Sequence, residues 1–138
     1  MTTSRPSQSR RSRPGPDLPL LREPPSIDAW GAGGFRVSGQ WRPGSLLILD
    51  DQPSDWRPRR ISDLEPVDFT AVIEAGRAVS EFVLLGTGTA QALPPRPVRD
   101  AILAAGLGFE FMASDAAARL HNVLASEGRR FATALIAV

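Results

Sequence analysis

Residues 81–88, EFVLLGTG, decide the fold of this chain. The apolar run 82–85 contains no polar residue, and such a run is typical of a strand that is covered on both faces, as in parallel sheets. Gly86 and Gly88 end the run, because glycine interrupts regular structure and favours turns. The stretch therefore predicts a central strand with helices packed on either side of it.

Helices and strands are predicted to alternate in the chain that follows. A helix is expected over 95–105, since proline is tolerated in a first helical turn and Gly106 suits the end of the helix. Residues 108–112 alternate between the two faces of a strand. A helix is predicted over 114–127, with Ser114 as its N-cap, and a last strand over 131–138.

The N-terminal half is predicted to be rich in strands. Residues 27–30 and 35–38 alternate apolar and polar side chains around a glycine-rich turn, which is typical of a β-hairpin. Residues 45–49 predict a buried strand, and Asp68 suits the N-cap of a helix that ends between residues 73 and 77. This order indicates an α/β fold with three layers: a mixed, mostly parallel central sheet with helices packed on it, plus the N-terminal β-hairpin.

Residues 1–25 differ in composition from the remainder of the chain. Prolines and serines are frequent there, and residues 1–22 carry five arginines against one acid. Such a segment cannot bury enough apolar surface to offset the entropy of ordering it. We therefore expect a disordered tail over 1–25 and a single α/β domain over 26–138. The alternatives for the tail are an arm for nucleic acid or anionic lipid, and an organelle transit peptide.

The composition excludes several classes of protein. The chain has no cysteine and all 16 basic residues are arginine, which excludes disulfides, cysteine nucleophiles and Schiff-base lysines. No apolar run reaches the ~18 residues of a membrane span, and no signal peptide is visible. No aromatic residue is interleaved with the arginines of the tail, so nucleic-acid binding is not expected. We expect a bacterial cytoplasmic protein without metal or cofactor; mitochondrial targeting is the alternative.

Gly86, Thr87 and Gly88 are the first candidate binding residues. They follow the central strand, at the place where α/β folds bind ligands, and glycine amides can hold a phosphate. The next helix begins about seven residues later, too far for a phosphate cradle between strand and helix. The alternative interpretation is a tight exit turn from a buried strand.

The helix predicted over 114–127 carries the second group of candidates. One polar stripe of this helix holds Asp115, Arg119, Asn122 and Ser126, and it forms either a solvated face or a recognition face for a partner. His121 is the only histidine, and it falls at the edge of the apolar stripe. Because no G-x-S-x-G motif accompanies it, catalysis by His121 is not expected.

Two tryptophans of the N-terminal half are candidates for a partner-binding surface. Trp41 and Trp56 lie in predicted loops, next to Arg42 and Arg57 respectively. Tryptophan and arginine are enriched among the residues that dominate protein–protein binding.

Three segments of the C-terminal half resemble a known family. Residues 84–88, 106–114 and 116–130 are similar to a small family of unknown biochemical activity. Its members include the mitochondrial complex I (NADH dehydrogenase) assembly factor and the adipogenesis-associated protein with the same domain. The string Met-x-Ser-x-x-Ala-x-Arg-x-x-Asn-x-Leu-x-x-Glu-Gly-Arg at 112–129 carries the resemblance. This chain has Leu120 and His121 where the family typically carries Thr-Tyr, so it lacks that tyrosine hydroxyl.

The resemblance implies a three-layer α/β fold and no established enzyme activity. The matching positions are the candidate functional residues: Gly86, Gly88, Arg119, Asn122, Glu127 and Arg129. We therefore expect a non-catalytic protein-binding or assembly-factor domain, monomeric or weakly dimeric, with subunits of respiratory complex I as possible partners. The alternative is a small-ligand-binding protein or hydrolase that uses the crevice near residues 86–89.

Overall fold

The computed structural model describes residues 22–138. The predicted disordered tail over 1–25 therefore falls mostly outside the described residues. The elements follow one another as β1 (Ile27–Gly31), β2 (Gly34–Val37), β3 (Gln40–Pro43), β4 (Ser45–Leu49), β5 (Gln52–Trp56), the 3-10 helices η2 (Ile61–Asp63) and η3 (Pro66–Phe69), α1 (Thr70–Ala75), β6 (Phe82–Gly86), α2 (Arg96–Ala104), β7 (Gly108–Met112), α3 (Ser114–Ser126) and β8 (Ala132–Leu135).

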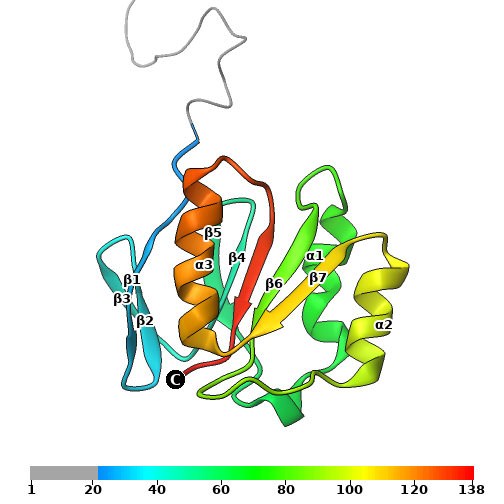
Figure 1. The fold of residues 1–138 in the computed structure, drawn as a ribbon, viewed down its shortest axis with the longest axis horizontal. Helices are drawn as coiled ribbons and strands as arrows, with labels where there is room; N and C mark the ends of the chain where they lie inside the picture. The colour runs from blue at the N-terminus through cyan, green and yellow to red at the C-terminus, as the bar shows by residue number, and fades with distance from the viewer. Residues whose placement is uncertain (1–21) are drawn as a thin grey trace, which may run out of the picture.

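The main sheet has five strands in the order β5-β4-β8-β6-β7 (Figure 1). β6 is an inner strand that runs parallel to both of its neighbours, β7 and β8, as its apolar run predicts, although the middle strand of the sheet is β8. β4 pairs antiparallel with both β5 and β8. The sheet is therefore mixed, and the prediction of a mostly parallel sheet is wrong. Only the crossovers through α2 and α3 create parallel neighbours, whereas β5 returns beside β4 by a tight turn.

The N-terminal region forms a three-stranded antiparallel sheet, β1-β2-β3, and not the predicted two-stranded hairpin. The sequence of β3, QWRP, is polar and ends in proline, so it gives no strand signal. The turn before it places both Ser38 and Gly39 at positive φ, 49° and 83°. Two successive positive φ angles are typical of the type I′ turn that joins adjacent antiparallel strands.

Helices cover both faces of the main sheet, which gives the predicted three layers (Figure 1). On one face, Val83 and Leu85 of β6 pack in a core with Val72 of α1 and with Val98 and Ile102 of α2. Alternate residues of a strand point to opposite faces, so the residue between them belongs to the other layer.

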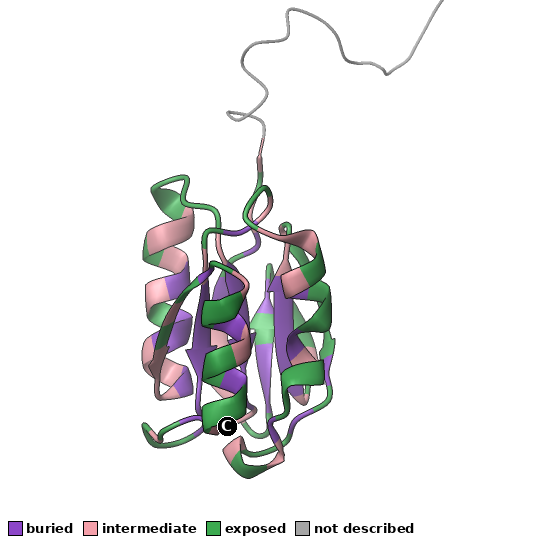
Figure 2. Cartoon of the chain, turned by 90° about the vertical axis from the view of Figure 1, so that its right-hand side faces the viewer, coloured by how far each residue is buried: buried purple, intermediate pink, exposed green. Residues whose placement is uncertain are grey.

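The opposite face is covered by α3 and by the small sheet. Leu84 of β6 packs there with Ala117 of α3 and with Ile27 and Phe35 of the small sheet. All four side chains are essentially inaccessible to water, and Figure 2 shows the strands buried between helices whose outer surfaces are exposed. Burying a large apolar side chain contributes about 1.5–3 kcal/mol, so both layers are needed for stability.

Two predicted N-caps serve other roles. α3 begins at Ser114, but its N-cap is Ala113, and the hydroxyl of Ser114 does not cap the helix. Asp68 lies within η3, where its carboxylate accepts the backbone N–H of Glu65. Asp68 also accepts from Arg57, 11 residues away, and Ser114 donates to Ile136, 22 residues away. Local sequence does not reveal these distant partners.

Residues just before β1 lie against the body of the protein. The guanidinium of Arg22 donates to both carboxylate oxygens of Asp51, at 3.0 and 2.9 Å. Pro25 is buried, and its carbonyl lies 2.8 Å from Nε2 of His121. The chain that enters β1 is thus attached to the β4–β5 turn and to α3.

Candidate functional site

The carboxyl ends of β6 and β8 form the switch point of the sheet. β6 continues through α2 to β7 on one side, whereas β7 continues through α3 to β8 on the other side. In α/β sheets such a point normally opens a crevice for a ligand. Here the hydroxyl of Ser114 occupies it: the hydroxyl accepts the N–H of Gly88 at 2.9 Å and donates to the carbonyl of Ile136 at 2.7 Å.

The predicted glycine loop is closely packed around this bridge. A Cβ atom on Gly86 would lie 2.7 Å from the Ser114 hydroxyl oxygen and 2.8 Å from its Cα, so only glycine fits. The side chain of Thr87 is buried, and its hydroxyl donates to the carbonyl of Ala90 at 2.7 Å and accepts from the N–H of Ala92 at 3.1 Å. The polar groups of Thr87 and Gly88 are therefore engaged within the protein.

A shallow hollow of about 200 Å³ lies beside the glycine loop. We call it the Trp30 hollow; its lining residues are Trp30, Gly31, Gly88, Thr89, Asp115 and Val138. The guanidinium of Arg119 lies over the Trp30 ring, 4.9 Å from its centre, and 3.7 Å from the carboxylate of Asp115. Arg119 itself does not line the hollow, but it lies against two residues that do, Trp30 and Asp115.

Asn122 and His121 face the interior of the protein. The amide of Asn122 donates to the carbonyl of Ile27 and accepts its N–H, both at 2.9 Å, and so anchors β1 to α3. His121 is 2 % exposed, with Nδ1 at 2.8 Å from the Thr133 hydroxyl. Because the Pro25 carbonyl can only accept, Nε2 carries the proton and Nδ1 accepts. Burial lowers the pKa of His121, which favours the neutral ring.

Glu127 and Arg129 lie at the other end of the sheet. Glu127 is the C-cap of α3 and is exposed. The guanidinium of Arg129 lies 5.3 Å from the centre of the Phe82 ring, near the start of β6. α3 runs antiparallel to β6 and β8, so its last residues are remote from the glycine loop. The residues that the family resemblance selects therefore do not form one site.

The two candidate tryptophans have different surroundings. Trp41 lies on β3 and is 45 % exposed, whereas Trp56, at the end of β5, is 8 % exposed. The indole N–H of Trp56 donates to the carbonyl of Asp68 at 3.0 Å, and its ring packs edge-on against Phe69. Trp56 is thus part of the core, and of the two only Trp41 offers a largely open ring to a partner.

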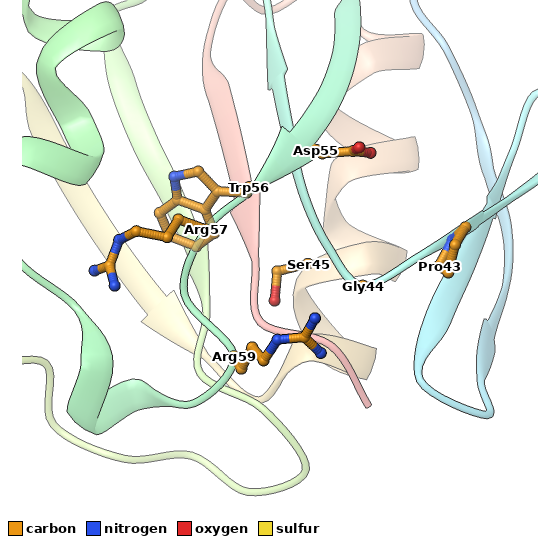
Figure 3. Close-up of a pocket in the computed structure, with 7 residues that line it drawn as sticks. All are labelled: Pro43, Gly44, Ser45, Asp55, Trp56, Arg57 and Arg59. Atoms are coloured by element: carbon orange, nitrogen blue, oxygen red, sulfur yellow. The ribbon is translucent and has the colours of Figure 1, made fainter.

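A second cavity, which the sequence did not indicate, lies where β3 leads into β4 and β5 ends. Its volume is about 280 Å³, and we call it the Arg59 cavity; it is lined by Pro43, Gly44, Ser45, Asp55, Trp56, Arg57 and Arg59 (Figure 3). Figure 3 shows the Ser45 hydroxyl directed toward the side where Arg59 lies, whereas Arg57 extends away from that side.

The edges of the main sheet are a further feature that sequence reasoning missed. β5 and β7 are the two outer strands. In β7, the N–H of Gly108 donates to Glu81, and the carbonyl of Met112 accepts from Thr87. Because backbone groups alternate in direction along a strand, Glu110 also bonds toward β6. The N–H and C=O groups of Phe109 and Phe111 therefore point away from the sheet.

A family model for proteins of unknown function, DUF498/DUF598, matches residues 27–136. The chain belongs to this family. The match spans almost the whole predicted domain, and it confirms the resemblance to a small family of unknown activity. An uncharacterised protein of Rhodobacter capsulatus is 34 % identical to this DUF498/DUF598 protein over 110 residues, which are 80 % of this chain and 82 % of the relative.

Solved structures of several bacterial proteins are similar to this DUF498/DUF598 domain. A Bordetella parapertussis protein is 27 % identical with a TM-score of 0.75, covering 85 % of this chain and 98 % of its own. An outer membrane protein from Bartonella henselae is 30 % identical with a TM-score of 0.73, and the match covers 83 % of this chain and 96 % of the Bartonella chain. The fold is shared by a Mth938-like domain from Bordetella pertussis, which is 24 % identical with a TM-score of 0.69. This match covers 94 % of this chain and 92 % of the Bordetella pertussis chain.

Residues 22–138 contain neither a membrane-spanning helix nor a metal-binding cluster. No helix in this part of the chain is long and apolar enough to cross a membrane. No group of three or more histidine, aspartate or glutamate side chains in the same range is arranged to hold a metal ion.

Proposed function

We propose that this domain is a non-catalytic protein-binding module that pairs the open edge of β7 with an extended segment of a partner. The observation that carries the proposal is the outward direction of the backbone groups of Phe109 and Phe111 on an edge strand. A strand edge of this kind is a template for another strand, and main-chain hydrogen bonds then supply affinity.

The side chains of β7 support this use of the edge. Phe109 and Phe111 are half-buried and lie on one face of the strand, with ring centres 6.0 Å apart. Glu110, on the other face, is exposed and has no ion-pair partner among the described residues. A partner strand could therefore add apolar contacts on one face and a basic side chain opposite Glu110 on the other.

The polar groups near the glycine loop support a role without catalysis. Ser114, the hydroxyl nearest the switch point, bonds to two backbone groups and not to His121. Both ring nitrogens of His121 have structural partners, Thr133 and Pro25. A nucleophile needs a base within hydrogen-bonding reach, and these two side chains do not provide that pair.

The family resemblance supports subunits of respiratory complex I as the first partners to test. Glu110 disfavours a tight homodimer in which the β7 strands of two copies pair antiparallel about Glu110. The two Glu110 carboxylates would then lie directly opposite each other and repel. A monomer or weak homodimer in the cytoplasm completes the proposal. The Bartonella relative is described as an outer membrane protein, so cell fractionation of the native protein should accompany the partner search.

Site-specific photo-crosslinking in the native cell tests the edge directly. A photoreactive amino acid at Glu110 on β7 should yield discrete crosslinks to particular proteins. The same probe at Ser54, an exposed residue on the opposite edge strand β5, is the matched control and should not yield them. Identical crosslinks from both positions, or none from Glu110, would count against binding through β7.

The Trp30 hollow favours a second candidate, a small-ligand-binding protein or hydrolase. The Trp30 ring and the Asp115 carboxylate line it, and the Arg119 guanidinium lies against both, so these side chains suit a small polar molecule. A thermal-shift screen with metabolites tests this candidate, since a ligand at 100-fold its Kd raises stability by about 2.7 kcal/mol. The rise in melting temperature should disappear in Arg119→Gln. If no metabolite raises the melting temperature, the ligand-binding candidate is contradicted and the β7 proposal remains.

A further inference from the structure

We infer that the Arg59 cavity binds a small oxyanion, a phosphate or carboxylate group, between the guanidinium of Arg59 and the hydroxyl of Ser45. This site is independent of the β7 edge. Ligand pockets usually span about 300–1,000 Å³. A cavity of about 280 Å³ therefore suits a small molecule or a terminal group.

Arg59 supplies the positive charge of the cavity. Its guanidinium has no hydrogen bond or ion pair with any residue in 22–138, and only its backbone N–H is bonded, to Asp63. Guanidinium groups present paired donors that match the oxygens of carboxylates and phosphates. The side chain is thus available to a ligand in the cavity that it lines.

The other two charged residues that line the cavity, Arg57 and Asp55, are each paired. Arg57 donates two hydrogen bonds to Asp68, at 2.8 and 2.6 Å. These bonds raise the pKa of Arg57. Burial alone would raise the pKa of Asp68, but the hydrogen bonds from Arg57 and from the backbone of Glu65 lower it, so this pair stays ionised. Asp55 lies 3.4 Å from Arg42. Among the lining residues, Arg59 is therefore the charge without an ion-pair partner in 22–138.

Ser45 supplies a second donor. The residue is 5 % exposed, and its hydroxyl oxygen accepts the N–H of Ala137 at 2.9 Å. Its proton has no acceptor among the residues that the structure describes. A buried donor without an acceptor is costly, and an oxyanion in the cavity would accept it. Figure 3 shows this hydroxyl and the Arg59 side chain on the same side of the cavity.

NMR titration of the full chain with inorganic phosphate and, separately, with succinate tests the site at constant ionic strength. At least one of the two anions should shift the amide signals of Ser45 and Arg59 in a saturable way, and the arm that saturates identifies the oxyanion. Titration with chloride alone sets the background.

Two arginine variants make the test specific. Arg59→Gln should weaken binding roughly tenfold or more, since it removes a charge-assisted hydrogen bond. Arg60→Gln, one residue away and outside the cavity lining, is the matched control and should bind as the unaltered chain does. Shifts that do not saturate with either anion, or that persist unchanged in Arg59→Gln, would overturn the inference.

Discussion

The two edges of the main sheet, β5 and β7, present different groups to their surroundings. In β5, Leu49 and Gln52 flank a two-residue turn, which makes them a hydrogen-bonded pair and directs the backbone of Pro53 and Asp55 outward. Proline has no N–H to offer, and aspartate adds a charge. In β7, the outward positions are held by Phe109 and Phe111 instead.

The difference indicates that one edge is protected and the other is kept for binding. Proline and charged residues are common means of preventing edge-to-edge association. β5 has both, and Asp55 is held in addition by Arg42 of the small sheet. β7 has neither proline nor a charge at its outward positions. An open aromatic edge is an aggregation hazard unless a partner uses it, and this supports β7 as the binding edge.

The largest expected effect comes from placing proline at Glu110, the β7 position whose backbone groups bond to β6. Glu110→Pro would remove an N–H that bonds to β6 and leave a buried carbonyl without its partner, so it should lower the free energy of unfolding by about 3 kcal/mol. Chemical denaturation measures this, with Pro53→Ala on β5 as the control of small effect. If Glu110→Pro left the free energy of unfolding unchanged, the N–H of Glu110 would not bond to β6, and the backbone groups of Phe109 and Phe111 would face β6 instead.

The second effect separates the switch point of the sheet from its edge. Ser114→Ala would leave the N–H of Gly88 and the carbonyl of Ile136 without the bridging hydroxyl and should cost about 2 kcal/mol of stability. Crosslinking from Glu110 should survive in the folded variant, because β7 is unchanged. If this variant remained folded but lost its crosslinks, the binding site would lie at the switch point and not at the edge.

The third effect is a pH dependence that should leave the β7 edge unaffected. Burial lowers the pKa of His121 below its ordinary value of 6.5, so the unfolded chain binds more protons than the folded one below that pH. This contribution to stability is complete above pH 6.5 and declines as pH falls, by at most about 1.4 kcal/mol per pH unit. Thermal melts from pH 8 to 5 measure this decline, and the melting temperature should fall by on the order of a few degrees.

His121→Gln is the control for the pH series. This variant should lose the decline between pH 6.5 and 5, whatever its absolute stability. Crosslinking from Glu110 should be constant over the same range in the unaltered protein. An equally steep decline without the histidine would assign the pH dependence to other groups.

The smallest effect on stability is expected at the protected edge. Pro53→Val would restore an outward N–H on β5 and should change the free energy of unfolding by no more than about 0.5 kcal/mol, since Pro53 makes no ladder bond there. It should nevertheless increase self-association in sedimentation velocity experiments, because the edge is then open. A variant that stays as monomeric as the unaltered chain would show that Pro53 does not protect this edge.

The C-terminal elements could be predicted because their apolar patterns are local. β6, α2, β7, α3 and β8 all lie within about two residues of their predicted ranges, apart from the end of β8, which is three residues shorter. β3 and β5 could not be predicted, since both are polar, contain proline and depend on strands that pair with them. The turn before β5 has Asp50 and Asp51 at φ of 52° and 63°, and neither is glycine.

The candidate site was less accessible to sequence reasoning. Asn122 and His121 were recognised as polar positions of a helix, but their partners Ile27 and Pro25 are 95 and 96 residues away along the chain. The importance of β7 comes from its outer position in the sheet, and strand order is not encoded in the local pattern. The alternation of Gly108–Met112 predicted a strand and could not show that its far side is unpaired.

Amide hydrogen exchange of β7 tests the central claim most directly. In the free protein, the amides of Phe109 and Phe111 should exchange rapidly, whereas the amide of Glu110 should be protected by its bond to β6. In a complex with the protein that crosslinks to Glu110, the amides of Phe109 and Phe111 should become protected as well. If both continue to exchange rapidly in that complex, the partner does not pair with β7, and binding through this edge is contradicted.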